Sequence, residues 1–96
     1  MKWQVIFTNK AAKQTRTIGK RAEAALRLLV EDLCHKGPAQ FEWPHYGKLV
    51  TKKNIDCRHC HLIRGNPTFV CCWAVVDNTV KIIEIYYVGT HENAPY

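Results

Sequence analysis

Residues 56–88 have the sequence DCRHCHLIRGNPTFVCCWAVVDNTVKIIEIYYV, and this stretch decides the fold. Three consecutive strands are predicted in it, at 56–63, 68–76 and 79–88, and the second and third are rich in β-branched and aromatic residues. Arg64-Gly-Asn-Pro67 predicts a turn between the first two strands, and Asp77-Asn78 predicts a tight turn between the second and third. Consecutive hairpins of this kind predict an antiparallel meander sheet.

The residues before this stretch predict one strand followed by two helices. We expect the strand at residues 2–8, a short helix over 10–17 that is ended by Gly19, and a longer helix over 20–36 whose apolar residues recur at three- and four-residue steps. A short strand is expected at residues 48–50, and a tail with no element of its own after residue 88.

This order of elements predicts an α+β fold, with two N-terminal helices packed on one face of a small antiparallel sheet and the other face left open. The chain of 96 residues is long enough for one domain, which we expect to span residues 1–96. No apolar stretch reaches the ~18 residues that span a bilayer, and residues 1–7 do not resemble a signal peptide. We therefore expect a cytoplasmic protein that does not enter the membrane.

The five cysteines are an odd number and include the neighbours Cys71 and Cys72. We interpret them as reduced packing residues, because a disulfide framework normally uses an even set. The formal net charge is +6, and 13 of the 14 Lys and Arg residues lie in residues 1–66. This charge favours a polyanionic partner, although a soluble domain with a basic surface would show the same balance.

His59 and His61 are the first candidates for chemistry. Alternate residues of a strand share a face, so both imidazoles are expected to point the same way, about 7 Å apart. A pair of imidazoles with ordinary pKa values near 6.5 suits proton transfer at neutral pH. The alternative is a pair of solvated histidines on an exposed sheet face.

Basic and aromatic side chains surround these histidines in the sequence and suit an RNA ligand. Lysine and arginine side chains could hold phosphates and stabilise a pentavalent transition state. Aromatic side chains could stack on unpaired bases, although each is more often a packing residue. The basic candidates are Lys48, Lys52, Lys53, Arg58 and Arg64, and the aromatic ones are Phe41, Trp43, Tyr46, Tyr86, Tyr87 and Tyr96.

A zinc site is the competing interpretation of the same stretch. Cys57 and Cys60, with the histidines and Cys71-Cys72, supply ligand types at plausible density. However, residues three apart on a regular strand face opposite ways, and no glycine or proline between them would form a zinc knuckle. We therefore expect no metal and no cofactor.

The C-terminal half resembles toxins of the RelE/ParE superfamily, in particular the RelE and HigB-type mRNA interferases of type II toxin–antitoxin systems. The resemblance rests on the hairpin of residues 68–80, the strand 81–87 and the tail VGTHENAPY of 88–96. It implies a toxin that enters the 30S ribosomal A site, cuts mRNA there and so inhibits translation. It also implies a cognate antitoxin, whose acidic, helix-bearing segment would suit the basic surface.

The resemblance also implies roles for single residues. His59 and His61 occupy third-strand positions where RelE has lysines, His91 matches a position held by arginine or histidine, and Tyr96 resembles the family's terminal aromatic residue. The sequence departs from the pattern at Val70, where RelE has an arginine, and Arg64 is a substitute for it only by conjecture.

The chemistry expected of such a site is attack of a ribose 2′-OH on the adjacent phosphate. We expect His59 or His61 to act as base, His91 as acid, Tyr96 to position the substrate, and Lys48, Lys53, Arg58 and Arg64 to bind RNA phosphates. Because the nucleophile belongs to the substrate, no metal is required. Two other functions stay open: a ParE-like inhibitor of DNA gyrase, which cuts nothing, and a non-catalytic RNA-binding module.

Overall fold

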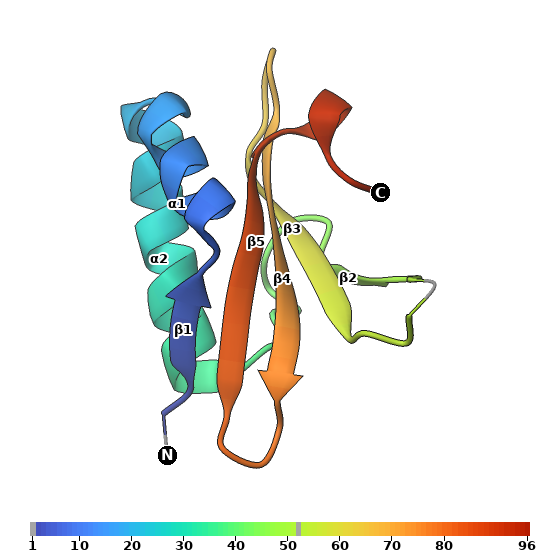
Figure 1. Cartoon of the computed structure of the whole chain (residues 1–96). Helices are drawn as coiled ribbons and strands as arrows, with labels where there is room; N and C mark the ends of the chain where they lie inside the picture. The colour runs from blue at the N-terminus through green and yellow to red at the C-terminus, as the bar shows by residue number, and fades with distance from the viewer. Residues whose placement is uncertain (1, 52) are drawn as a thin grey trace.

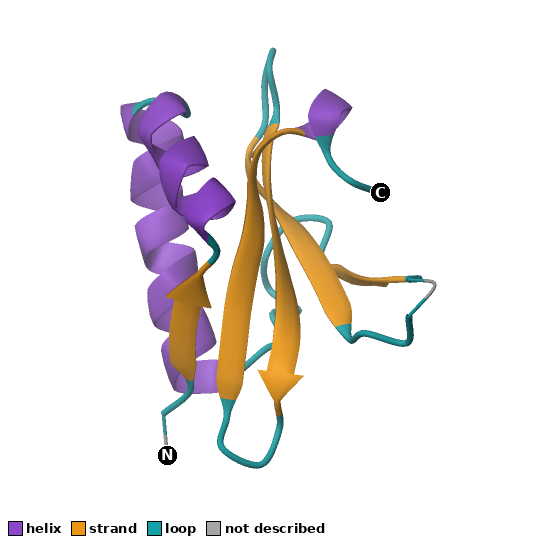
Figure 2. Ribbon diagram, in the orientation of Figure 1, coloured by secondary structure: helices purple, strands orange, loops and turns teal. Residues whose placement is uncertain are grey.

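Among the residues that the structure describes, five strands form one mixed sheet, in the order β1–β5–β4–β3–β2 (Figure 1). The computed structural model describes residues 2–51 and 53–96. Its strands are β1 (Gln4–Phe7), β2 (Gly47–Leu49), β3 (Cys57–Ile63), β4 (Phe69–Asp77) and β5 (Ile82–Thr90). The α+β class that the sequence predicted is confirmed, since two α-helices accompany this sheet (Figure 2).

The prediction of an entirely antiparallel sheet is wrong at one strand. The meander of β2 to β5 is antiparallel throughout, but β1 pairs in parallel with β5, with Gln4 opposite Ile82 and Phe7 opposite Ile85. Parallel neighbours need a long crossover, and the chain between β1 and β5 supplies it through both helices and the rest of the meander. The first half of β5, the last strand of the meander, thus lies beside the first strand of the chain.

The helices begin and end close to their predicted residues. α1 (Asn9–Gln14) is capped by Thr8, whose hydroxyl accepts a hydrogen bond of 3.0 Å from the backbone N–H of Ala11, and it continues as the 3-10 helix η1 (Thr15–Thr17). α2 (Lys20–Lys36) lies between Gly19 and Gly37, which have φ angles of 86° and 88°. Only glycine adopts such angles without strain, which explains both ends of α2.

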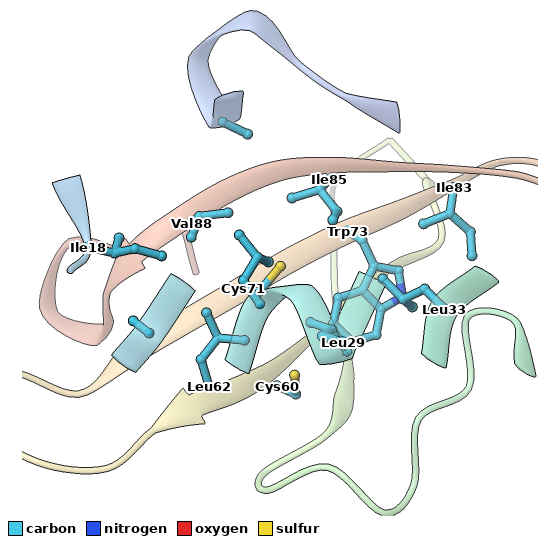
Figure 3. Close-up of a cluster of buried hydrophobic side chains, with 13 residues drawn as sticks. Ile18, Leu29, Leu33, Cys60, Leu62, Cys71, Trp73, Ile83, Ile85 and Val88 are labelled. Atoms are coloured by element: carbon cyan, nitrogen blue, oxygen red, sulfur yellow. The ribbon is translucent and has the colours of Figure 1, made fainter. Parts of the chain in front are cut away.

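The larger core lies between the helices and one face of the sheet (Figure 3). Trp73 is fully buried there, and its indole N–H donates a 3.2 Å hydrogen bond to the carbonyl of Pro38. Alternate strand residues enter this core because successive side chains of a strand point to opposite faces. The buried members are Ala11, Ile18, Ala22, Leu26, Leu29, Leu33, Cys60, Leu62, Cys71, Trp73, Ile83, Ile85 and Val88.

The opposite face of the sheet carries a smaller cluster of Val70, Cys72 and Tyr87. His59 pairs with Cys72 across the β3–β4 ladder and His61 pairs with Val70, so both histidines belong to this face. All five cysteines are free thiols, and four of them are buried. They pack as small apolar residues, in agreement with the interpretation from sequence.

Two local predictions are corrected. The β4–β5 turn is not a tight turn at Asp77-Asn78, because the chain turns over residues 78–81 and the Asp77 carboxylate accepts hydrogen bonds from the N–H groups of Thr79 and Val80. The tail does contain regular structure, because β5 extends to Thr90 and is followed by the 3-10 helix η2 (His91–Asn93). Among the residues described, no helix has the length and apolar content to cross a membrane.

Candidate functional site: a histidine cluster on the open sheet face

His59 and His61 lie on the same face of β3, as their spacing predicted. Both side chains are half-buried. Their neighbours on β4, Cys72 and Val70, are buried and uncharged, so this flank of the histidines offers no cation. Further polar groups reach the site from the β2 side, from the β3–β4 turn and from the C-terminal segment.

His45 reaches the site from the loop before β2, and sequence reasoning did not place it there. Its ring stacks on that of His61, with centroids 4.1 Å apart and planes 24° from parallel. The ladder explains this position, because Gly47 lies opposite His59 and continuation of the antiparallel register by two residues places residue 45 opposite residue 61. The backbone N–H of His61 also donates a 2.8 Å hydrogen bond to the carbonyl of Pro44.

His91 joins the cluster from the end of β5. Its ring lies edge-on to His61, with centroids 5.3 Å apart. Its backbone N–H donates a 2.8 Å hydrogen bond to the carbonyl of Thr68, and the hydroxyl of Tyr87 donates one of 2.7 Å to the carbonyl of Thr90. These two bonds fix the chain on both sides of the β5–η2 junction, and so orient His91 toward β3.

Tyr96 folds back over β3 and completes the cluster. Its ring stacks on His59 at a centroid distance of 4.6 Å and lies edge-on to His91 at 6.1 Å. The structure thus brings together all four residues that were predicted to be catalytic, His59, His61, His91 and Tyr96, and adds His45.

The environment lowers the pKa values of the two β3 histidines. For His59, burial is the largest cause and the charges of His91 and His45 add to it; for His61, burial is followed by the charges of His45, His91 and His59. The Nδ1 atom of His59 is buried without a hydrogen-bond partner. Both rings are therefore neutral near pH 7, which is the state that accepts a proton.

A cavity of about 310 Å³ opens beside this cluster. His61 and His91 line one part of it, and the β3–β4 turn and the β5–η2 junction line the rest. The other lining residues are Gly65, Asn66, Pro67, Thr68, Thr90 and Glu92. A ligand in this cavity would contact both imidazoles, because they border the same space.

The predicted RNA-binding cations lie in different places. Arg58 is held in an ion pair with Asp56 at 2.9 Å and donates a 3.0 Å hydrogen bond to the hydroxyl of Tyr46, on the face opposite His59. Lys48 is opposite Arg58 in the β2–β3 ladder and therefore shares that face. Lys53 and Arg64 are exposed, in the β2–β3 loop and directly after β3. Lys52 lies outside the described residues.

The aromatic candidates also separate. Trp43 and Tyr46 pack against the larger core, while Tyr86 and Tyr87 belong to the smaller cluster. Phe41 is 82% exposed and lies edge-on to Tyr46. Of these candidates, Tyr96 is the one whose ring stacks on a histidine of the cluster.

The alternative of a zinc site finds no support in the geometry. Cys57 faces the histidine side of β3, whereas Cys60 is buried in the larger core on the other side. Across residues 2–51 and 53–96, no group of three or more histidine, cysteine or carboxylate side chains is arranged to hold a metal ion.

No protein-family model matches the chain, and no curated protein matches its sequence. Solved structures match it in fold. A chain of the archaeal RelE–RelB complex from Pyrococcus horikoshii OT3 aligns with a TM-score of 0.75 and 16% identity, over 98% of this chain and 100% of that one. A double arginine-to-alanine mutant of the E. coli toxin RelE in the free state aligns with a TM-score of 0.71 and 15% identity, over 98% of this chain and 88% of that one. The chain therefore has the RelE fold over nearly its whole length.

Proposed function

We propose that this protein is the toxin of a toxin–antitoxin pair and that it cleaves mRNA in the ribosomal A site. The observation that carries the proposal is the pairing of His61 with His91, whose rings lie 5.3 Å apart beside a cavity of about 310 Å³. These residues come from distant parts of the chain and meet on the open face of a RelE fold. Two imidazoles that border one space provide a base and an acid for the same phosphate.

The reaction that these groups support is an internal transesterification. Neutral His61 takes the proton of a ribose 2′-OH, and the 2′ oxygen attacks the adjacent phosphorus atom. Protonated His91 gives its proton to the departing 5′ oxygen, so that a 2′,3′-cyclic phosphate and a free 5′-OH are formed. His59 is a less suitable base than His61, because Tyr96 covers its ring.

Tyr96 has a positioning role in this proposal. Burial raises the pKa of its hydroxyl, which therefore stays protonated and able to donate a hydrogen bond at neutral pH. Lys53 and Arg64 are the cations best placed to hold RNA phosphates, since both are exposed. Lys48 would act from the edge of the sheet, while Arg58 is already paired with Asp56.

An antitoxin is the protein partner that the fold and charge favour. One of the similar structures is itself a RelE–RelB complex. The net charge of +6 suits an acidic partner segment that competes with RNA for the same surface.

The test is inducible expression of the chain, alone and together with the adjacent gene, in which we expect the antitoxin to be encoded, followed by mapping of mRNA 5′ ends. We expect breaks within ribosome-bound codons for the wild type, and loss of at least ~100-fold in cleavage for His61→Ala and His91→Ala. His35→Ala is the matched control, because this exposed histidine at the end of α2 lies outside the cluster. Growth arrest without RNA breaks, accompanied by loss of DNA supercoiling, would instead indicate a gyrase inhibitor.

A further inference from the structure

His45 is the residue of the histidine cluster that the proposed reaction leaves without a role. It stacks on the β2 flank of His61, whereas the β4 flank is formed by Val70 and Cys72. A transition state with an additional negative charge on phosphorus needs a cation or a strong hydrogen-bond donor beside the base. Because His91 already serves as the acid for the leaving oxygen, His45 is the neighbour of His61 that is left to supply one.

The backbone at His45 points to a role for its imidazole beyond folding. The residue has a φ of 55°, in the left-handed region where glycine and asparagine are the easier choices. Its side chain is exposed, so it contributes little buried area to the fold. A histidine that is held in this conformation over a half-buried histidine is explained more simply by its chemistry than by its packing.

We propose that His45 is a further catalytic residue, whose protonated imidazole binds a non-bridging oxygen of the scissile phosphate while neutral His61 accepts the 2′-OH proton. The proposal rests on the nuclease function proposed above. His45 transfers no proton in this scheme: the proton of the 2′-OH goes to His61, the phosphorus–5′-oxygen bond breaks, and His91 protonates the leaving oxygen.

The stacked geometry accounts for the division of roles. Two imidazoles at 4.1 Å repel each other when both are protonated, so the pair holds one proton more readily than two. Burial penalises a charge on His61 and lowers the pKa of that ring, whereas the side chain of His45 is exposed. The other ionisable groups at this face, among the residues described, are Cys57, His59, Cys72, Tyr86, Tyr87, His91, Glu92 and Tyr96.

Three substitutions separate charge from stacking. His45→Asn keeps a residue that tolerates the left-handed backbone but removes the ring, His45→Phe keeps an aromatic ring without a proton, and His45→Arg restores a positive charge. His35→Asn is the matched control. The measurements are the single-turnover rate of mRNA cleavage on programmed ribosomes from pH 5 to 8.5, and the titration of His61 by NMR in the free protein.

We expect both His45→Asn and His45→Phe to lower the cleavage rate by about 100-fold, and His45→Arg to remain within about tenfold of the wild type. The acid limb of the rate profile and the His61 titration should both move to higher pH in His45→Asn, because a neighbouring positive charge has been removed. Wild-type rates in His45→Asn, or in His45→Phe, would overturn the role of His45 and leave the nuclease function standing. Absence of cleavage by the folded wild-type protein would overturn both.

Discussion

The phenol ring of Tyr96 covers the imidazole of His59, with ring centroids 4.6 Å apart and planes 26° from parallel. The contact joins the last residue of the chain to the middle of β3 and holds the C-terminal segment against the open sheet face. It also contributes to the burial of His59, whose Nδ1 has no hydrogen-bond partner. The C-terminal residue is therefore part of the site and shapes its acid–base properties.

Removal of this ring is expected to change both the titration of His59 and the activity. In Tyr96→Ala, water reaches the imidazole, and the pKa of His59 should rise toward its ordinary value because burial is the main cause of its depression. RNA cleavage should also fall, because Tyr96 positions the substrate in the proposed reaction. Tyr96→Phe keeps the stack and should leave the His59 titration unchanged. An NMR titration of the three proteins checks this, and a His59 pKa that is equally low in Tyr96→Ala would contradict it.

The depressed pKa values of His59 and His61 also make stability depend on pH. The unfolded chain protonates these rings near pH 6.5, whereas the folded chain protonates them only at lower pH. Between these limits the unfolded state binds more protons, so the free energy of unfolding should decrease as the pH falls below about 6.5 and level off once the folded protein is protonated too. Urea unfolding at pH 7.5, 6.5, 5.5 and 4.5 measures this. The double variant His59→Asn/His61→Asn should show a smaller change in the free energy of unfolding with pH below about 6.5. A slope equal to that of the wild type would assign the effect to other groups.

The elements of the fold could be predicted from sequence because local signals specify them. Thr8 marks the start of α1, Gly19 and Gly37 mark the ends of α2, and the three segments of residues 56–88 that were predicted as strands become β3, β4 and β5. The parallel pairing of β1 with β5 was missed, because it depends on where the chain lies after two helices and not on any local pattern. The four-residue turn after Asp77 was missed because its side-chain hydrogen bonds, and not a glycine, stabilise it.

The same distinction applies to the site. The alternation of strand residues places His59 and His61 on one face, and this follows from sequence alone. The position of His45 depends on the register of β2 against β3, and a three-residue edge strand gives little indication of its register in the sequence. Arg58 appeared to belong to the site only because it is next to His59 in the chain; its side chain points the other way and is held by Asp56.

Arg58 is therefore expected to stabilise the fold more than it binds RNA. Its guanidinium makes two hydrogen bonds to Asp56 and one to the hydroxyl of Tyr46, and its side chain is only 11% exposed. Arg58→Gln should lower the free energy of unfolding by roughly 1–3 kcal/mol, because a partly buried carboxylate loses its partner. The salt dependence of RNA binding should not change in this variant.

Arg64→Gln alters an exposed cation. Its stability should be kept, while the salt slope of RNA binding becomes shallower by about one. The opposite result would be a salt slope equal to that of the wild type in Arg64→Gln and a shallower one in Arg58→Gln. It would make Arg58, and not Arg64, the cation that binds RNA.

Gly89 is expected to be necessary for the position of His91. A Cβ atom at residue 89 would lie 2.7 Å from the hydroxyl oxygen of Tyr87 and 2.9 Å from its Cζ atom, closer than such atoms can approach. Gly89→Ala should therefore displace the Tyr87 ring, break its 2.7 Å hydrogen bond to the carbonyl of Thr90, and lower the free energy of unfolding by about 1–3 kcal/mol. Because Thr90 precedes His91, cleavage should decrease by more than the fraction of unfolded protein explains.

Gly47→Ala is the matched control, since a Cβ there would meet only the His59 Nε2 atom at an ordinary 3.8 Å. Urea unfolding and single-turnover cleavage of the two variants make the comparison, and normal cleavage by a destabilised Gly89→Ala protein would show that the Tyr87–Thr90 bond does not position His91.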